Sequence, residues 1–146
     1  MSSGNHVASR LPQSFGSYRI AVADNVNVNT TGANVIVLPI LSGGITSTGG
    51  GYIVRRITVT NQTGANAAPC NVSILTSSDG NVSNQVTGNV LLSSLSANNT
   101  WQDITLNATT NSTILTAQCL FRNVITGTSN GTGLLSFAVY GDMVQL

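Results

Sequence analysis

The sequence predicts an all-β protein built as an antiparallel β-sandwich. Stretches rich in Val, Ile and Thr alternate with a period of two, none shows the 3.6-residue period of a helix, and Gly, Asn and Ser clusters separate them. A jelly roll is the first choice and an immunoglobulin-like sandwich the second. Trp101 lies between two cysteines, but much closer to Cys119 than to Cys70, which is the reverse of the immunoglobulin arrangement.

The expected strands share a period-two pattern or a β-rich apolar run, and each is bounded by turn residues. In chain order they are 18–23, 33–41, 49–61, 70–76, 101–106, 114–124 and 134–146, with a short ambiguous run at 91–95. The second of them contains Pro39, which cannot donate a ladder hydrogen bond, so this strand is expected at a sheet edge or to end at the proline.

Alternation also assigns one face of several strands to the core. The assigned residues are Tyr18, Ile20 and Val22; Cys70, Val72 and Ile74; Ile104 and Leu106; Leu115, Ala117, Cys119 and Phe121; and Leu135, Phe137, Val139 and Met143.

The stretch 49–61 is expected to be a central strand, yet strict alternation within it would direct Arg55 toward the core. A buried cation without a partner is costly. We therefore expect either a β-bulge at Arg55 and Arg56, which brings Tyr52 and Val54 onto the face of the later core residues, or a carboxylate that pairs with Arg55.

The chain divides into an extended N-terminal arm, residues 1–16, and one sandwich domain, residues 17–146. The arm mixes Ser, Gly, Asn and Pro with the isolated apolar residues Leu11 and Phe15, a pattern that suits neither a helix nor a core strand. Two interpretations remain open: a frayed terminus, or an arm that becomes ordered on a neighbouring subunit and uses Arg10, Leu11 and Phe15.

Charge is sparse, because only 6% of the residues are charged and Lys and Glu are absent. Five arginines and four aspartates give a formal net charge of +1, which lacks the basic cluster needed for nucleic-acid binding. No apolar run is long enough to cross a bilayer, and the first residues lack the apolar core of a secretion signal, so we expect synthesis in a cytoplasm without export.

Catalytic chemistry is also sparse in this sequence. The single histidine, His6, lies in the arm, so no Ser-His-Asp or Cys-His constellation can be assembled. We therefore expect that the protein is not an enzyme and that it binds no cofactor or metal. A carboxylate pair such as Asp79 with Asp103 is the one hydrolytic alternative. Cys70 and Cys119 are expected to be two buried thiols, with a disulfide as the alternative.

The missing lysines bear on assembly, because natural sheets protect exposed edge strands with charge, lysine above all. Uncharged edges indicate that other subunits cover them in a stable assembly, so a homo-oligomer is expected.

Two stretches and the composition also carry a resemblance. YIVRRITVTN at 52–61 and LLSFAVYGDMVQL at 134–146, in a chain rich in Asn, Thr, Ser and Gly, resemble the small virion proteins of tailed bacteriophages, above all capsid decoration or cement proteins. The resemblance spans residues 17–146. It implies a trimer that binds the major capsid protein between capsomers, on the outer capsid surface, and reinforces the shell.

Two alternatives remain: a carbohydrate- or receptor-binding module of a phage tail or fibre, which would use the few aromatic residues, and a shell-forming jelly-roll capsid protein. The candidate residues for a capsid or subunit interface are Arg10, Leu11, Phe15, Arg55, Arg56 and Trp101.

Overall fold

The structure is a computed structural model, and it describes residues 18–27, 32–39, 50–64, 70–79, 81–126 and 134–144. The arm, residues 1–16, lies outside the described residues. The elements in chain order are β1 (Tyr18–Asn27), β2 (Gly32–Pro39), β3 (Gly51–Asn61), β4 (Cys70–Leu75), the 3₁₀ turn η1 (Val82–Asn84), β5 (Val90–Leu92), β6 (Trp101–Ile104), the 3₁₀ turn η2 (Thr110–Ser112), β7 (Cys119–Thr126) and β8 (Leu134–Val144).

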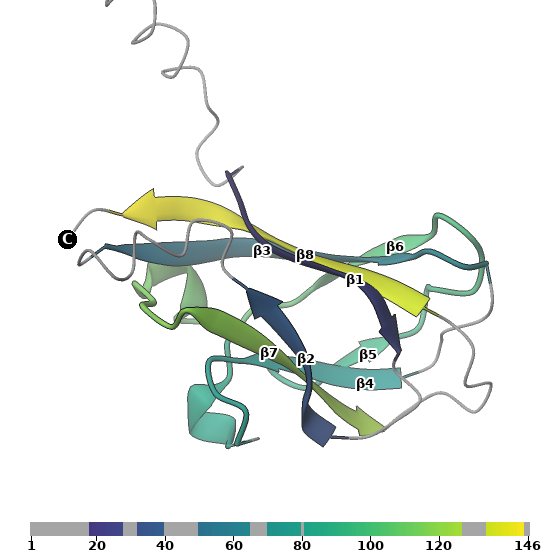
Figure 1. Cartoon of the computed structure of the whole chain (residues 1–146), viewed down its shortest axis with the longest axis horizontal. Coiled ribbons are helices and arrows are strands. Elements are labelled where there is room, and N and C mark those ends of the chain that lie inside the picture. The colour runs from purple at the N-terminus through teal and green to yellow at the C-terminus, as the bar shows by residue number, and fades with distance from the viewer. Residues whose placement is uncertain are drawn as a thin grey trace, which may run out of the picture.

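These strands form two four-stranded antiparallel sheets, ordered β1-β8-β3-β6 and β2-β7-β4-β5, which pack face to face (Figure 1). The prediction of an all-β sandwich is therefore confirmed. The pairing is nested: β1 pairs with β8, β2 with β7, β3 with β6 and β4 with β5. A single long hairpin that folds over on itself would bring the strands together in this order.

The core lies between the two sheets and is filled by both inner faces. It contains Ile20, Val26, Tyr52, Val54, Ile57, Val59, Cys70, Val72, Ile74, Leu92, Leu95, Ile104, Leu120, Val124, Leu135, Phe137 and Val139. The inward faces predicted for β4 and β8 are confirmed, since their alternate residues are buried, with Met143 only partly so. Because many of these side chains are β-branched, they suit the pleated inner faces that they cover.

The β-bulge predicted in β3 is present, and Arg55 also has the carboxylate partner that was the predicted alternative. The register of β3 against β8 shifts between Val54 and Arg56, which places Tyr52 and Val54 in the core with the later apolar residues. Arg55 then points to Asp142 on β8, with 2.9 Å between Nε and Oδ2. The bulge therefore resolves the conflict between alternation and a buried cation.

Gly141 allows the strands to approach at this bulge. A Cβ at Gly141 would lie only 1.8 Å from the carbonyl oxygen of Ile53 and 2.8 Å from Ile20 of β1. The glycine therefore sits where irregularities in the two neighbours of β8 converge, since β1 also shifts register between Arg19 and Ala21.

β1 is longer and less regular than predicted. It continues to Asn27 through a second register shift, at which Asn25 adopts a φ of 56° and its amide donates to Gln62 Oε1. The two shifts change which side chains face inward. Ile20 is buried as expected, but Tyr18 is exposed and Val22 only partly covered, so the assignment of these two to the core is wrong.

The inward face that alternation predicts for Cys119 and Phe121 in β7 is wrong. β7 begins at Cys119 and buries Leu120, Arg122 and Val124, whereas Cys119 and Phe121 are only partly covered. Both cysteines are free thiols, as expected, but only Cys70 is fully buried. Period two was correct here but its phase was not, because this central strand has apolar residues on both faces.

The open side of the sandwich is closed by Gln102. Its side chain donates to the carbonyl of Leu91 at 2.9 Å and accepts from the amides of Ser93 and Ser94, so it ties β6 of one sheet to β5 of the other. These two edge strands, β5 and β6, are short, and short edges resist pairing with foreign strands. On the far edge, β2 ends at Pro39, as expected. Part of the edge protection is thus internal and uncharged, which weakens the argument from missing lysine.

Candidate functional site

Most of the described charge lies on one surface, the outer face of the β1-β8-β3-β6 sheet. Of the eight arginines and aspartates in the described ranges, only Arg122 and Asp79 lie elsewhere. We call this surface the charged face. Its charged members are Arg19, Asp24, Arg55, Arg56, Asp103 and Asp142, and its exposed or half-exposed aromatic residues are Tyr140 and Trp101.

One row across the charged face joins two arginines through a tyrosine. Tyr140 of β8 lies between Arg19 of β1 and Arg56 of β3, its register partners on either side. The guanidinium carbon of Arg56 lies 4.8 Å from the centre of the Tyr140 ring, which is within cation–π range. The row therefore presents positive charge on an aromatic support.

The aspartates of the charged face lie among its arginines and beyond them. Asp103 of β6 accepts from Thr58 Oγ1 at 2.6 Å, and its Oδ1 lies 4.0 Å from Nε of Arg56. Asp24 of β1 accepts from Ser136 Oγ at 2.7 Å. The charged face is therefore not uniformly basic, because it carries both signs of charge.

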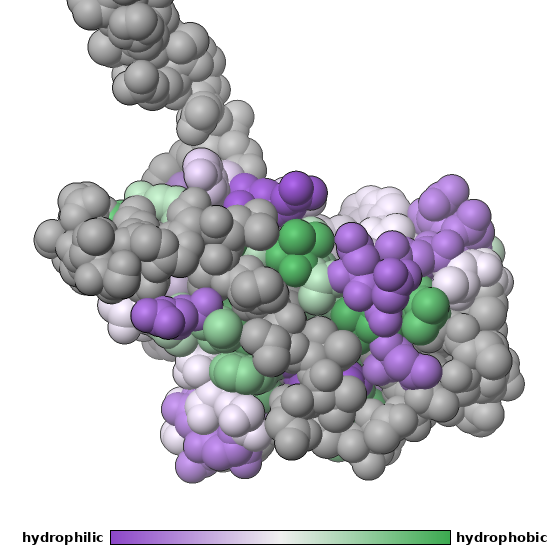
Figure 2. All heavy atoms as spheres, viewed as in Figure 1, coloured by the Kyte–Doolittle hydropathy of each residue, from purple (hydrophilic) through white to green (hydrophobic). Residues whose placement is uncertain are grey.

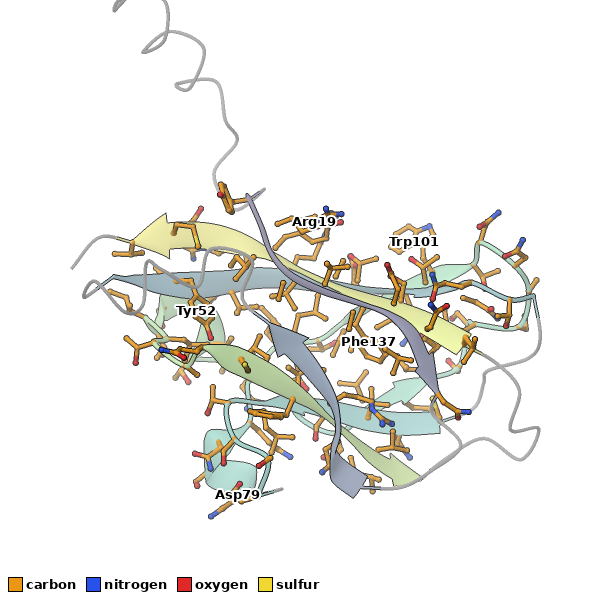
Figure 3. The ribbon with its side chains drawn as sticks, viewed as in Figure 1. Arg19, Tyr52, Asp79, Trp101 and Phe137 are labelled. Atoms are coloured by element: carbon orange, nitrogen blue, oxygen red, sulfur yellow. The ribbon has the colours of Figure 1, made fainter. Side chains whose placement is uncertain are left out.

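Trp101 is the most exposed large hydrophobic side chain among the described residues, at 62%. It lies on the edge strand β6, opposite Thr60 of β3. Figure 3 shows Trp101 and Arg19 projecting from the outer side of this sheet, while Tyr52 and Phe137 lie between the sheets. The exposed surface of an indole thus lies on the same sheet face as the Thr58 hydroxyl and the Asp103 carboxylate.

The structure brings three predicted interface residues, Arg55, Arg56 and Trp101, onto one face, but they differ in exposure and in their bonds. Arg56 and Trp101 are exposed, with 57% of the Arg56 side chain open to solvent. Arg55 is engaged with Asp142 and with the carbonyl of Asn111, so it holds the sheet to the η2 segment. The other three candidates, Arg10, Leu11 and Phe15, lie outside the described residues.

Sequence reasoning missed Arg19, Asp24, Asp103 and Tyr140 as members of this face. A signal for two of them was available, because alternation places Tyr140 in β8 and Asp103 in β6 opposite to the core residues. That they share one face with Arg19 and Asp24 depends on the pairing of the strands, which the sequence does not contain.

Sequence reasoning also missed Arg122, the only buried charged side chain among the described residues. It is fully buried on the inner face of β7, and none of its three guanidinium nitrogens has a hydrogen-bond partner in the described structure. Burial lowers the pKa of Arg122 from its usual 12.5 to about 10, and burial raises the pKa of the neighbouring Cys70 thiol to about 11. All four aspartates of the chain lie on other surfaces, so no side-chain carboxylate neutralises this cation.

The hydrolytic alternative is not supported by the geometry. Asp79 lies in the turn after β4 (Figure 3), where it accepts from the Asn81 amide at 2.9 Å and from the Asn84 side chain, whereas Asp103 lies in β6 of the other sheet. These local hydrogen bonds lower the pKa of the Asp79 carboxyl. The two carboxylates therefore do not form a pair.

Within the described residues, no three His, Cys, Asp or Glu side chains lie close enough together to hold a metal ion. In the same part of the chain, no helix is long and apolar enough to span a bilayer.

Comparisons with known proteins return no match: no family model, no curated protein and no solved structure is significantly similar to this chain. The interpretation of the charged face therefore rests on its own chemistry.

Proposed function

We propose that this protein is a non-enzymatic virion structural protein, a capsid decoration or cement protein that binds the major capsid protein between capsomers on the outer shell. The observation that carries the proposal is the charged face. Trp, Tyr and Arg are the residue types that dominate binding energy at protein interfaces, and this sheet face combines Trp101, Tyr140 and two arginines.

The charge pattern supports a protein partner rather than a nucleic acid. Three arginines and three aspartates share the face, so a duplex would meet repulsion as well as attraction. A protein surface can match such a mixed pattern of charge, and this complementarity sets the register of binding.

We further infer that the sandwich is a jelly roll, the architecture common in viral capsid proteins. The nested strand pairing supports this, since an immunoglobulin sandwich places its seven to nine strands in differently ordered sheets. We also propose that the protein acts as a homo-oligomer, most simply a trimer, because decoration proteins occupy symmetric positions between capsomers.

The test is co-sedimentation of the purified protein with shells that lack it, taken from the virus that encodes it. Trp101→Ala and Arg56→Ala should each weaken binding by roughly tenfold or more, as expected for hot-spot residues. Leu91→Ala is the matched control, because Leu91 is 51% exposed but belongs to β5 in the other sheet. If all three variants bind equally, or if no variant and no wild-type protein binds shells, the proposal is wrong.

The arm has a separate test. A chain that begins at Ser17 should still fold and unfold cooperatively, because the arm's apolar residues are too few to complete a core. If the arm contributes to attachment, this truncated chain will decorate shells less tightly. Undiminished occupancy would confine the shell interface to the sandwich.

A second function is favoured by one specific observation, the 62% exposure of Trp101 beside the Thr58 and Asp103 oxygens. An exposed indole on a flat polar face can stack on a sugar ring, as in a carbohydrate- or receptor-binding module of a tail or fibre. A glycan array decides between the two: specific binding that Trp101→Ala abolishes would favour the sugar, and its absence would favour the capsid.

A further inference from the structure

A short segment before β7, residues 113–117, lies along the first half of β3. Its centre is Leu115, which exchanges two backbone hydrogen bonds with Tyr52 at 2.8 and 2.9 Å. The hydroxyl of Tyr52 also donates to the carbonyl of Ala117 at 2.7 Å. Gly51 allows this approach, since a Cβ there would lie 2.6 Å from the Ile114 side chain. The segment thus takes the edge position that β6 holds farther along β3.

Among the described residues, nothing pairs with the outer side of this segment. In an antiparallel pair, a residue that exchanges both hydrogen bonds leaves its two neighbours pointing their N–H and C=O groups to the opposite side. The neighbours of Leu115 are Ile114 and Thr116, and no backbone hydrogen bond joins either of them to the described residues. Ile114 is 42% exposed and Thr116 is exposed, so the edge is open to a partner.

A groove runs beside this edge. One part of about 510 Å³ is bounded by the segment on one side and by the end of β4 and Asn84 on the other. A second part of about 200 Å³ continues past Gln85 and the threonines of the η2 region. Its walls, as far as the described residues form them, carry hydroxyls, amides and the aliphatic side chains of Ile114 and Leu115, and no charged residue. Such a groove suits an extended, uncharged peptide that adds as a strand.

The N-terminal arm has the matching chemistry and starts at the right end. Residues 1–16 are mostly Ser, Gly, Asn, Gln and apolar residues, with Pro12, with Arg10 and His6 as their only basic side chains, and with no acidic residue. Tyr18 pairs with Gly141, which pairs with Val54, two residues from the Tyr52 that bonds Leu115. The arm therefore begins at the end of the sandwich that holds the groove.

We propose that the arm of a second copy of this chain adds as a β-strand to the Ile114–Thr116 edge, so that copies are joined by exchanged arms. An extended arm reaches about 50 Å, at about 3.3 Å per residue, which is enough to span to a neighbour. On its own subunit, the arm would instead have to reverse and cross three strand spacings, about 14 Å, to reach the opposite edge. The inference rests on the proposed homo-oligomer and not on capsid attachment, so its tests use the free protein.

The first test measures mass in solution by light scattering, with no shell present. The full chain should assemble, whereas the chain that begins at Ser17 and the variant Thr116→Pro should both be monomers. Proline removes the N–H of the edge and cannot accept an added strand fully. Thr116→Ala is the matched control, because it removes the side chain but keeps the N–H, and it should assemble like the wild type.

Mixing completes the test. The truncated chain retains a groove and Thr116→Pro retains an arm, so the two monomers should form a 1:1 complex when combined. Wild-type assembly by either variant alone, or no complex on mixing, would overturn the proposal. A full chain that stays monomeric while its melting temperature depends on the arm would show docking in the same subunit, which also overturns it.

Amide hydrogen exchange keeps the proposal testable even if Thr116→Pro fails to fold. The amides of Ile114 and Thr116 should exchange at least tenfold more slowly in the full chain than in the chain that begins at Ser17, and this protection should increase with protein concentration. Equal exchange in the two chains would refute strand addition. If the arms still join copies of the chain but the protein does not bind shells, only the proposed function is contradicted.

Discussion

Arg122 offers the sharpest perturbation, because it is a buried cation that nothing in the described structure neutralises. We expect Arg122→Met to raise the free energy of unfolding. Methionine fills a similar length of the inner face of β7 with apolar atoms, against Ile74, the register partner of Arg122 in β4. Replacing buried charged groups by apolar residues of similar volume is often neutral or stabilising.

The magnitude follows from the pKa. Burial lowers the pKa of Arg122 from 12.5 to about 10, and each pKa unit corresponds to about 1.4 kcal/mol. The charged form therefore costs about 3 kcal/mol of stability at neutral pH. Removing that cost should raise the melting temperature of a chain of this size by roughly 10 °C.

The pH dependence of stability independently predicts the sign of the change caused by Arg122→Met. Between pH 10 and 12.5 the folded protein releases the Arg122 proton before the unfolded chain does, so the stability cost is complete below pH 10 and is relieved as the pH rises. The advantage of Arg122→Met over the wild type should accordingly be largest at neutral pH and shrink above pH 10.

Urea unfolding followed by circular dichroism measures this difference, with Arg19→Met as the control. Arg19 is exposed on the charged face, so its replacement should change stability by less than about 0.5 kcal/mol. If Arg122→Met instead loses about 3 kcal/mol or more, the guanidinium has strong partners in the folded protein, and the reasoning from its unpaired burial is refuted.

Three further outcomes are expected. Gly141→Ala should lower the free energy of unfolding by at least about 3 kcal/mol, since its Cβ would lie 1.8 Å from a β3 carbonyl oxygen. Gly88→Ala, whose Cβ would have its nearest neighbour at 3.6 Å, should be tolerated, and equal losses in urea unfolding would contradict the close approach at Gly141. At pH 8 a thiol reagent should label the half-covered Cys119 well before the buried Cys70, whose pKa is raised to about 11, and equal labelling rates would refute this difference in burial. Gln102→Ala should lower the free energy of unfolding by about 1–2 kcal/mol, because it leaves two amides and a carbonyl at the β5 edge without their partner, and an unchanged value would show that water replaces it.

Much of the fold could be predicted because local patterns and long-range pairing agree. In β8, residues from Leu135 to Val139 alternate between core and surface as their sequence suggests. In β3, the conflict between alternation and Arg55 was itself the signal for a bulge, since a chain rarely buries a cation when one extra residue can redirect it.

The rest could not be predicted because it depends on register. β7 has apolar residues on both faces, so only its pairing with β2 and β4 decides that Arg122 faces inward and Cys119 outward. The charged face has the same origin: Arg19 and Arg56 lie far apart in sequence and meet at Tyr140 only because β8 separates β1 from β3. No local pattern contains that information.

The distribution of charge relates the two proposed contact surfaces to one another. None of the described residues that line the groove beside Ile114 and Thr116 is charged, and a strand edge without charge does not discourage pairing. The charged face carries both signs of charge, with Arg56 Nε 4.0 Å from Asp103 Oδ1, so it selects partners by complementary charge. A chain with so few charges can therefore use backbone pairing to join its own copies and reserve its charges for a different protein. The two surfaces lie at different places in the fold, so Thr116→Pro and Arg56→Ala should separate self-association from attachment.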